Sequence, residues 1–132
     1  MNVIDLDGNK SQWKLTGYTV GIQHRDARSK YHLEARQLLR EVYPTLQILE
    51  EVSIQIHPGT TLYLDFFLPL IKLGVEVHGE QHYKRIPFFH PTKIDFLRQL
   101  GRDRDKVEWC EINGMDCVVL KYDEMDSWGE QL

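Results

Sequence analysis

Two acidic residues and a histidine stand at strand-like spacing near the middle of the chain. Asp65 lies inside the apolar run 62–68, and Glu76 and His78 lie in the next run, 72–78. Because side chains alternate between the faces of a strand, Glu76 and His78 share a face, and a hairpin can place Asp65 beside Glu76. For either carboxylate alone, a solvent-facing place on an edge strand is the favoured explanation. Asp65, Glu76 and His78 together on one face favour a functional site, because a buried carboxylate needs a partner or a metal ion.

Such a carboxylate pair has the chemistry of a divalent cation site. Two like charges 4 Å apart repel by about 1–4 kcal/mol, depending on the dielectric, and a cation removes that cost. Carboxylate oxygens suit Mg²⁺, which can polarise a phosphoryl oxygen and lower the pKa of an attacking water. His78 lies within reach of that water as a base or acid. His82 is either a further ligand or base, or a loop residue with its ring hydrogen-bonded.

The elements that must position these groups follow from periodicity and turn residues. A helix is predicted over residues 30–42, capped by Ser29, with Glu34 at the edge of its apolar stripe. Strands are predicted over residues 49–56, 62–68 and 72–78, as an antiparallel meander. In the second strand the alternation places Leu62, Leu64, Phe66 and Leu68 on one face and Tyr63, Asp65 and Phe67 on the other.

A second helix and a last strand complete the predicted α+β layered fold. The helix spans residues 93–113, with Gly101 as a weak point and Gly114 as its stop, and the strand spans residues 116–122. We expect one domain with three parts: a lead with short strands (1–28), a core (29–122) and a poorly ordered acidic tail (123–132).

Composition sets the class of protein. The chain has 132 residues and a formal net charge of −4, which excludes a generic basic nucleic-acid coat but not an enzyme with one basic face. No stretch approaches the length of a membrane span, and the N-terminus lacks a signal-peptide pattern. Two cysteines, Cys110 and Cys117, are too few for a disulfide framework. We expect an intracellular, cytoplasmic protein with no membrane partner.

Zinc is a competing use of the histidines. His78 and His82 are close in sequence, but Gly79 breaks the strand between them. The chain has no His-Glu-x-x-His helix, and its cysteines are remote from both histidines. The sequence therefore favours the carboxylates over a zinc site.

The order of these residues resembles a known family. Glu34 is followed by Asp65-Phe66, by the stretch Glu76-Val77-His78-Gly79-Glu80-Gln81-His82, by Arg102-Asp103 and Lys106 on a helix, and by Gly114 before a strand. This pattern resembles the PD-(D/E)-x-K superfamily of metal-dependent nucleases. It is most similar to the group of the very-short-patch-repair endonuclease and its homing-endonuclease relatives, the EDxHD group. The resemblance covers about residues 29–122.

The resemblance implies a restriction-endonuclease-like core, with a central mixed sheet of four strands flanked by helices. It implies DNA phosphodiester hydrolysis with Mg²⁺ or Mn²⁺ and a nicking, repair or homing role. In this family pattern Asp65 would be the central metal ligand and Glu76 would stand at the second acidic position. His78 would take the place of the usual lysine. Glu34 would contact a metal-bound water, and Asp103 would orient His82 or His78. Lys106 is a candidate for the missing lysine charge. For Glu34, Asp103 and Lys106 the alternative is an exposed helix face.

DNA is the expected partner. Candidate phosphate contacts are Lys84, Arg85, Arg28, Lys30 and Lys106. The loop that carries Lys84 and Arg85 also holds aromatic residues, which either stack on bases or form a hydrophobic flap. Recognition of a long site would need a homodimer or a further specificity partner, and related enzymes are often encoded by phages. The alternatives are an inactive nuclease-fold module that binds DNA or protein, and an acidic protein that mimics nucleic acid.

Overall fold

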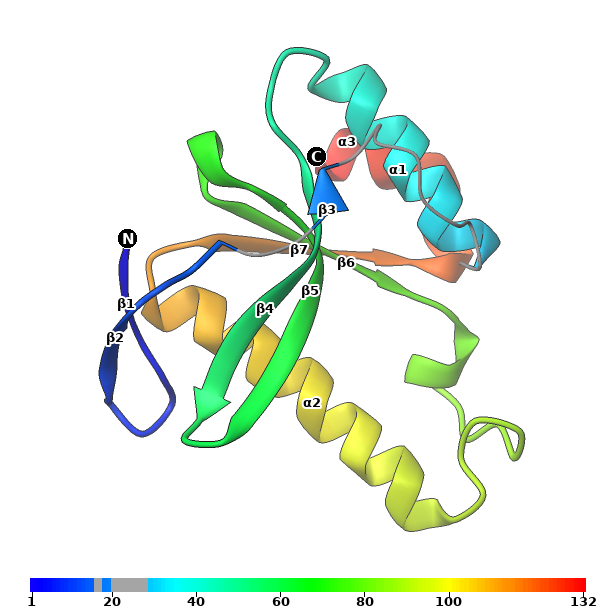
Figure 1. Ribbon diagram of the computed structural model, residues 1–132. Coiled ribbons are helices and arrows are strands. Elements are labelled where there is room, and N and C mark those ends of the chain that lie inside the picture. Colours follow the sequence, from blue (N-terminus) through cyan, green and yellow to red (C-terminus); the bar gives the residue numbers. More distant parts are fainter. Residues whose placement is uncertain (16–17, 20–28) are drawn as a thin grey trace.

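The computed structural model describes residues 1–15, 18–19 and 29–132 (Figure 1). Its strands are β1 (Asn2–Ile4), β2 (Lys10–Gln12), β3 (Tyr18–Thr19), β4 (Leu49–His57), β5 (Thr60–Leu68), β6 (Leu73–His78) and β7 (Asp116–Lys121). Its helices are α1 (Lys30–Val42), α2 (Lys93–Ile112) and α3 (Trp128–Gln131), with 3-10 turns at Pro69–Ile71, Glu80–His82 and Tyr122–Ser127. The predicted helices and strands agree with these bounds to within a few residues at each end.

The central sheet is mixed, as expected. Its order is β3-β4-β5-β6-β7, with antiparallel pairs from β3 to β6 and a parallel pair between β6 and β7. The predicted meander of β4, β5 and β6 is confirmed. The sheet has five described strands and not four, because the short β3 pairs with the edge of β4.

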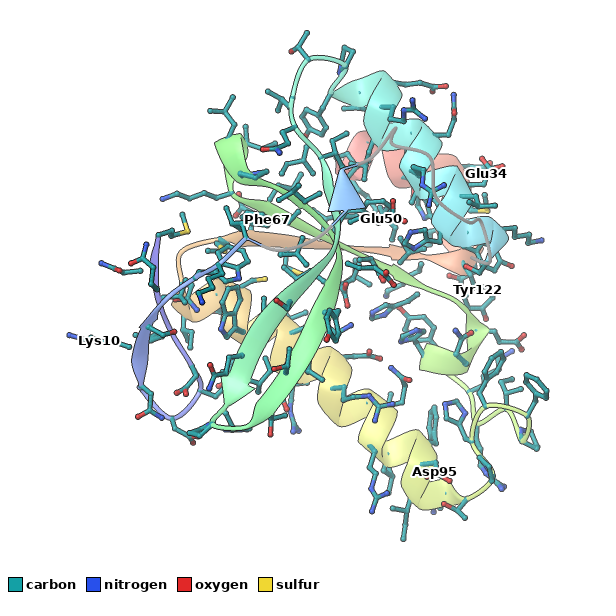
Figure 2. All side chains as sticks on the ribbon, viewed as in Figure 1. Lys10, Glu34, Glu50, Phe67, Asp95 and Tyr122 are labelled. Carbon is teal, nitrogen blue, oxygen red and sulfur yellow. The ribbon has the colours of Figure 1, made fainter. Side chains whose placement is uncertain are left out.

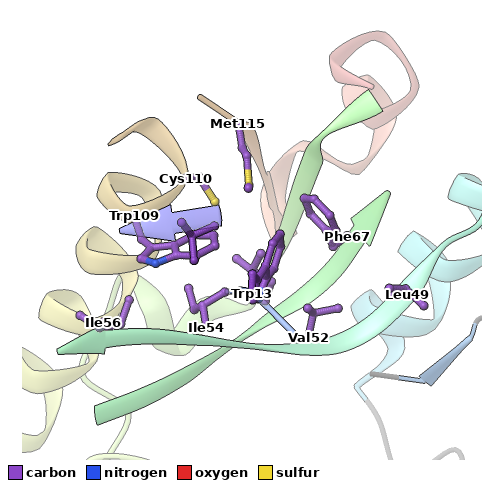
Figure 3. Close-up of a cluster of buried hydrophobic side chains, with 11 residues drawn as sticks. Trp13, Leu49, Val52, Ile54, Ile56, Phe67, Trp109, Cys110 and Met115 are labelled. Carbon is purple, nitrogen blue, oxygen red and sulfur yellow. The ribbon is translucent and has the colours of Figure 1, made fainter. Parts of the chain in front are cut away.

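Different helices cover the two faces of the sheet: α1 and α3 lie on one face and α2 on the other (Figure 1). On one face α1 and α3 pack through Ala35, Leu39 and Trp128 against strand residues that include Phe66 and Val75. On the other face α2 and the β1–β2 hairpin form the second core cluster around two tryptophans (Figure 3). Apolar burial on both faces is what holds a sheet of this kind in place.

Local capping explains where both long helices begin. The Ser29 side chain accepts a hydrogen bond from the backbone N–H of His32 at the start of α1. Thr92 and Asp95 form a reciprocal capping box at the start of α2. Gly114 follows α2 with a φ of 68°, a conformation that favours glycine. Gly101 does not interrupt α2. In the described part of the chain, no helix is both long and apolar enough to cross a bilayer.

Both ends of the chain contribute to the core. Trp13 is buried and donates its indole N–H to the carbonyl of Ser53 at 2.9 Å. Trp128 is only 2% exposed and donates to the carbonyl of Lys121. The expectation of a poorly ordered tail is therefore wrong, because this indole anchors residues 122–132 to the face that α1 covers.

The predicted alternation along β5 is wrong beyond Asp65, where the two faces exchange. Leu62 and Leu64 pack with Phe67 in the cluster on the α2 face, whereas Phe66 and Leu68 pack on the α1 face. The opposite residue of β4, Glu51, has a φ of 56°, in the left-handed region. The pairing of β4 with β5 keeps the same register before and after Glu51. The side chains of β5 therefore change direction at the same place as those of β4. The pleat therefore changes phase at Asp65.

Candidate active site

Asp65 and Glu76 meet across the β5–β6 hairpin, as predicted. The backbone register of the hairpin runs from Leu68 and Leu73 to Phe66 and Val75, just short of the two acids. At the two acids, hydrogen bonds from backbone N–H groups to carboxylate oxygens follow the backbone pairing of the hairpin. The backbone N–H of Asp65 donates to Glu76 Oε2 at 2.7 Å, and the N–H of Val77 donates to Asp65 Oδ2 at 2.8 Å. Each carboxylate is thus fixed by the other strand.

A single lysine compensates this carboxylate pair. Lys106 Nζ lies 2.7 Å from Glu76 Oε1, and the lysine side chain is 16% exposed. Burial, followed by the charge of Glu76, raises the pKa of Asp65 to about 7. Burial also raises the pKa of Glu76, although Lys106 opposes the shift. Lys106, which we expected to contact phosphate, therefore serves inside the site.

His78, His82 and Asp103 form a second group beside the acids. After Gly79 the turn Glu80–His82 folds back, so that the two imidazole rings stack with centroids 4.1 Å apart and planes 5° from parallel. His82 Nδ1 lies 2.8 Å from Asp103 Oδ2, which matches the predicted orienting role of Asp103. Gln99 donates to the other oxygen of Asp103 at 2.9 Å. The histidine and aspartate thus form a hydrogen-bonded dyad.

The His78 ring is held as a neutral base. Burial, followed by the neighbouring His82, lowers the pKa of His78 to about 4. Its Nδ1 lies 3.1 Å from the hydroxyl of Tyr83, and its Nε2 has no hydrogen-bond partner in the described residues. Burial would raise the pKa of Asp103, but the hydrogen bond and charge of His82 lower it. Asp103 therefore stays ionised beside the two rings.

An open cleft of about 610 Å³ exposes this group to solvent. Its lining includes His78, His82, Tyr83 and Asp103, and Lys121 at the end of β7 adds a cation. Asp65 is half-buried, whereas Glu76 is 1% exposed. A ligand in the cleft therefore meets the histidines and Asp103 directly.

Glu34 does not join these residues. It is exposed on α1, and it makes no hydrogen bond or ion pair to the predicted site within the part of the chain that the structure describes (Figure 2). His32 is the residue of α1 whose charge acts on Asp65. The role predicted for Glu34 stays a prediction without a geometric counterpart here.

The candidate DNA contacts are scattered. Lys84 is largely exposed and lies 3.5 Å from Glu80. Arg85 donates to the carbonyls of His90 and Pro91, so it braces its own loop. Lys30 is exposed over the ring of Tyr31. Arg28 lies outside the described residues. Phe88 and Phe89, which are 86% and 55% exposed, stand in the same loop as Arg85.

The sequence did not point to a third cluster, centred on Glu50. This fully buried carboxylate of β4 contacts His32 Nε2 and accepts two hydrogen bonds from Arg36, the shorter at 2.8 Å (Figure 2). Burial alone would raise the pKa of Glu50, but His32 and Arg36 lower it to about 2. The sequence signal for this cluster was the placement of two polar residues, His32 and Arg36, one helical turn apart beside the apolar Ala35 and Leu39. Their strand partner could not be read from spacing.

Comparison with known proteins gives relatives without a stated activity. No family model matches the chain, and no solved structure matches it. A stretch of 65 residues, 49% of the chain, is 42% identical to "Uncharacterized protein 307L" of Invertebrate iridescent virus 6. A stretch of 64 residues, 48% of the chain, is 41% identical to "Uncharacterized protein 033L" of Invertebrate iridescent virus 3. Each alignment covers 33% of the viral protein, so the chain matches about a third of either relative.

Proposed function

We propose that this chain is a metal-dependent endodeoxyribonuclease, and the observation that carries the proposal is the Asp65–Glu76 pair. Two carboxylates are held together at the point where a hairpin stops pairing, and Lys106 forms an ion pair with one of them, Glu76. Burial and the neighbouring charge of Glu76 raise the pKa of Asp65, so the ionised pair is unfavourable in the free protein. Groups with pKa values perturbed by burial and like charge gather at functional sites, where the shift suits their task.

The residues present fit a hard divalent ion. Asp65 is half-buried, with Oδ2 held by Val77, which leaves Oδ1 for a ligand, and Glu76 lies directly beside it. Mg²⁺ takes a few carboxylate oxygens and keeps several waters. When bound, such an ion polarises a phosphoryl oxygen and neutralises charge that develops on it. Asp65 and Glu76 would hold the ion, and Lys106 would keep Glu76 ionised.

The dyad of His82 and Asp103 suits proton transfer. In the proposed hydrolysis a water oxygen attacks phosphorus and the bond to the leaving oxygen breaks. His82, oriented by Asp103, accepts the proton of the attacking water. The leaving oxygen takes a proton from solvent in the open cleft. His78 is neutral and buried, so we assign it to positioning the phosphate and the His82 ring.

DNA is proposed as the substrate from the cations in and beside the cleft, which Glu108 and Glu111 also line. Lys121 lines the cleft, and Lys84 and Arg85 stand on the loop beside it. Cations give affinity for phosphates, and exposed rings such as Phe88 can stack on bases. We also propose a nicking, repair or homing role for the enzyme. A dimer or a further partner would extend the length of DNA that it recognises.

The experiment is cleavage of supercoiled plasmid in a series of Mg²⁺, Mn²⁺ and Ca²⁺. We expect nicked or linear product with Mg²⁺ or Mn²⁺, and loss of cleavage by at least about 100-fold in Asp65→Asn. Asp116→Asn is the matched control, because Asp116 is exposed at the opposite end of the parallel β6–β7 pair. Cleavage by Asp65→Asn at the rate of the parent would refute the site.

A second candidate function has one specific observation in its favour. Both oxygens of Glu76 are already occupied, one by Lys106 and one by the backbone of Asp65. A nuclease-fold module that binds DNA without cutting would show this internal pairing. It predicts retention on DNA at low salt, weaker retention at high salt, and no cleavage with any of the metal ions.

A further inference from the structure

Three residues beside the proposed catalytic acids can each offer one metal ligand. Suitable atoms of His78, His82 and Asp103 lie within 4.8 Å of one another. The residues come from the end of β6, from the turn Glu80–His82 and from α2, whose arrangement Figure 1 shows. The fold has thus gathered two imidazoles and a carboxylate from three elements.

One of these atoms has no partner. His78 is 6% exposed, and its Nε2 has no hydrogen-bond partner in the described residues. The nearest carboxylate atom, Asp103 Oδ1, is 3.9 Å away, which is too far for a hydrogen bond. Tyr83 occupies the other ring nitrogen, so the free atom is the one that faces Asp103. A buried polar atom without a partner requires an explanation, and an absent ion is one.

The distances and the donor types fit a transition metal. Zn²⁺ binds histidine nitrogen and carboxylate oxygen at about 2.0–2.2 Å, so two ligands of one ion lie on the order of 3–4 Å apart. The 3.9 Å between His78 and Asp103 falls in that range. The two ring planes lie 5° from parallel, so the His82 ring must turn to bind the same ion as His78, and His82 stands on a short, partly exposed turn. Mg²⁺ prefers an all-oxygen shell and is a poor match.

We propose that His78, His82 and Asp103 bind one Zn²⁺ ion at a site separate from Asp65 and Glu76. The sequence argued against zinc because Gly79 interrupts the strand between the histidines. The turn after Gly79 returns His82 over His78, and α2 supplies the third ligand. Three protein ligands and an open cleft leave a coordination position for water or substrate. If the proposed function holds, zinc here would block proton transfer and inhibit cleavage.

The test is calorimetric titration of the full, metal-free chain with Zn²⁺ and, separately, with Mg²⁺. We expect one Zn²⁺ per chain with a micromolar or tighter Kd, and a Kd at least about tenfold weaker in His82→Ala and in Asp103→Asn. His57→Ala is the matched control. His57 makes a similar contact with Asp7, at 2.8 Å, but no third ligand is grouped with that pair in the described residues.

The outcomes separate clearly. Absence of saturable Zn²⁺ binding, unchanged binding in His82→Ala and Asp103→Asn, or equal loss in His57→Ala would each overturn the site. Circular dichroism checks that the variants fold, and His82→Gln replaces His82→Ala if the latter does not. Asp65→Asn must keep the parent affinity for Zn²⁺. A chain that binds zinc as expected but cuts no DNA supports this site and refutes the proposed nuclease.

Discussion

The molecule holds two buried clusters of carboxylates and cations that differ in their charge balance. Glu50 on β4 is surrounded by His32 and Arg36, and its pKa falls to about 2. Asp65 on β5 lies beside Glu76, which pairs with Lys106, and burial together with Glu76 raises the pKa of Asp65 to about 7. The pKa shifts have opposite signs because hydrogen bonds and charges from His32 and Arg36 outweigh the burial of Glu50, whereas burial and the charge of Glu76 dominate at Asp65.

The difference agrees with a structural role for the Glu50 cluster and with the functional role that we propose for Asp65 and Glu76. The Glu50 cluster joins α1 to β4 and satisfies its own charge, so it needs no ligand. The Asp65 cluster is short of positive charge, which costs stability in the free protein and suits a site that binds a cation. The two clusters should therefore respond in opposite ways when a carboxylate is neutralised.

The largest effect is expected from Glu50→Gln. Removing the charge leaves Arg36 buried beside a neutral amide, and breaking a buried pair costs about 3–5 kcal/mol. Urea denaturation followed by circular dichroism measures the free energy of unfolding. A loss below about 1 kcal/mol would show that the Glu50 cluster does not stabilise the fold.

The pH dependence of the Glu50 effect comes next. The folded pKa of Glu50 is lowered from 4.5 to about 2, so its stabilisation is present above the unfolded value and is lost as pH falls toward 2. A shift of this size corresponds to about 3 kcal/mol. The unfolding free energies of the parent and Glu50→Gln should therefore converge between about pH 4.5 and pH 2. Parallel curves across that window would contradict the cluster.

Lys106→Met should weaken the fold by about 1–3 kcal/mol at neutral pH. The change leaves two carboxylates without their cation, although protonation of Asp65 limits the cost. Guanidinium denaturation at pH 7 is the measurement. The loss should shrink as the pH falls and both acids take up protons. A loss that does not change with pH would assign Lys106 a packing role only.

Asp65→Asn should act in the opposite direction and stabilise the fold by about 1 kcal/mol at pH 8. The folded pKa is raised from 3.8 to about 7, so ionised Asp65 destabilises the fold increasingly as pH rises through that window. The stability gap between variant and parent should open with rising pH and close near pH 4. Thermal denaturation across this pH range measures the stability difference between variant and parent. If Asp65→Asn is less stable than the parent at pH 8, Asp65 and Glu50 do not differ in the way described.

The smallest effect is expected from Glu34→Gln. Glu34 is exposed on α1, and such surface changes stay within about 0.5 kcal/mol. Its plasmid cleavage, compared with the parent, tests the role implied by the family resemblance. Unchanged cleavage would leave His32 as the residue of α1 that acts on Asp65.

Much of the fold could be predicted because its signals are local. Ser29 and Gly114 mark helix ends, and apolar runs between turn residues mark β4 to β6, whose antiparallel pairing the structure confirms. The pairing of Asp65 with Glu76 also followed, because a hairpin fixes which residues meet. The phase change at Asp65 could not be predicted, because it depends on the left-handed φ of Glu51 on another strand.

The sequence by itself determined the layered α+β architecture, the hairpin and the acids it brings together. Only the tertiary structure decided which charges neutralise them. Lys106 and Asp103 reach the site because α2 crosses that face of the sheet, and His82 returns over His78 through a turn. Periodicity predicts the face on which a side chain lies as long as the pleat keeps its phase, which β5 does not at Asp65. The partner that a side chain meets depends on how separate elements pack, and that packing sets charge balance and pKa.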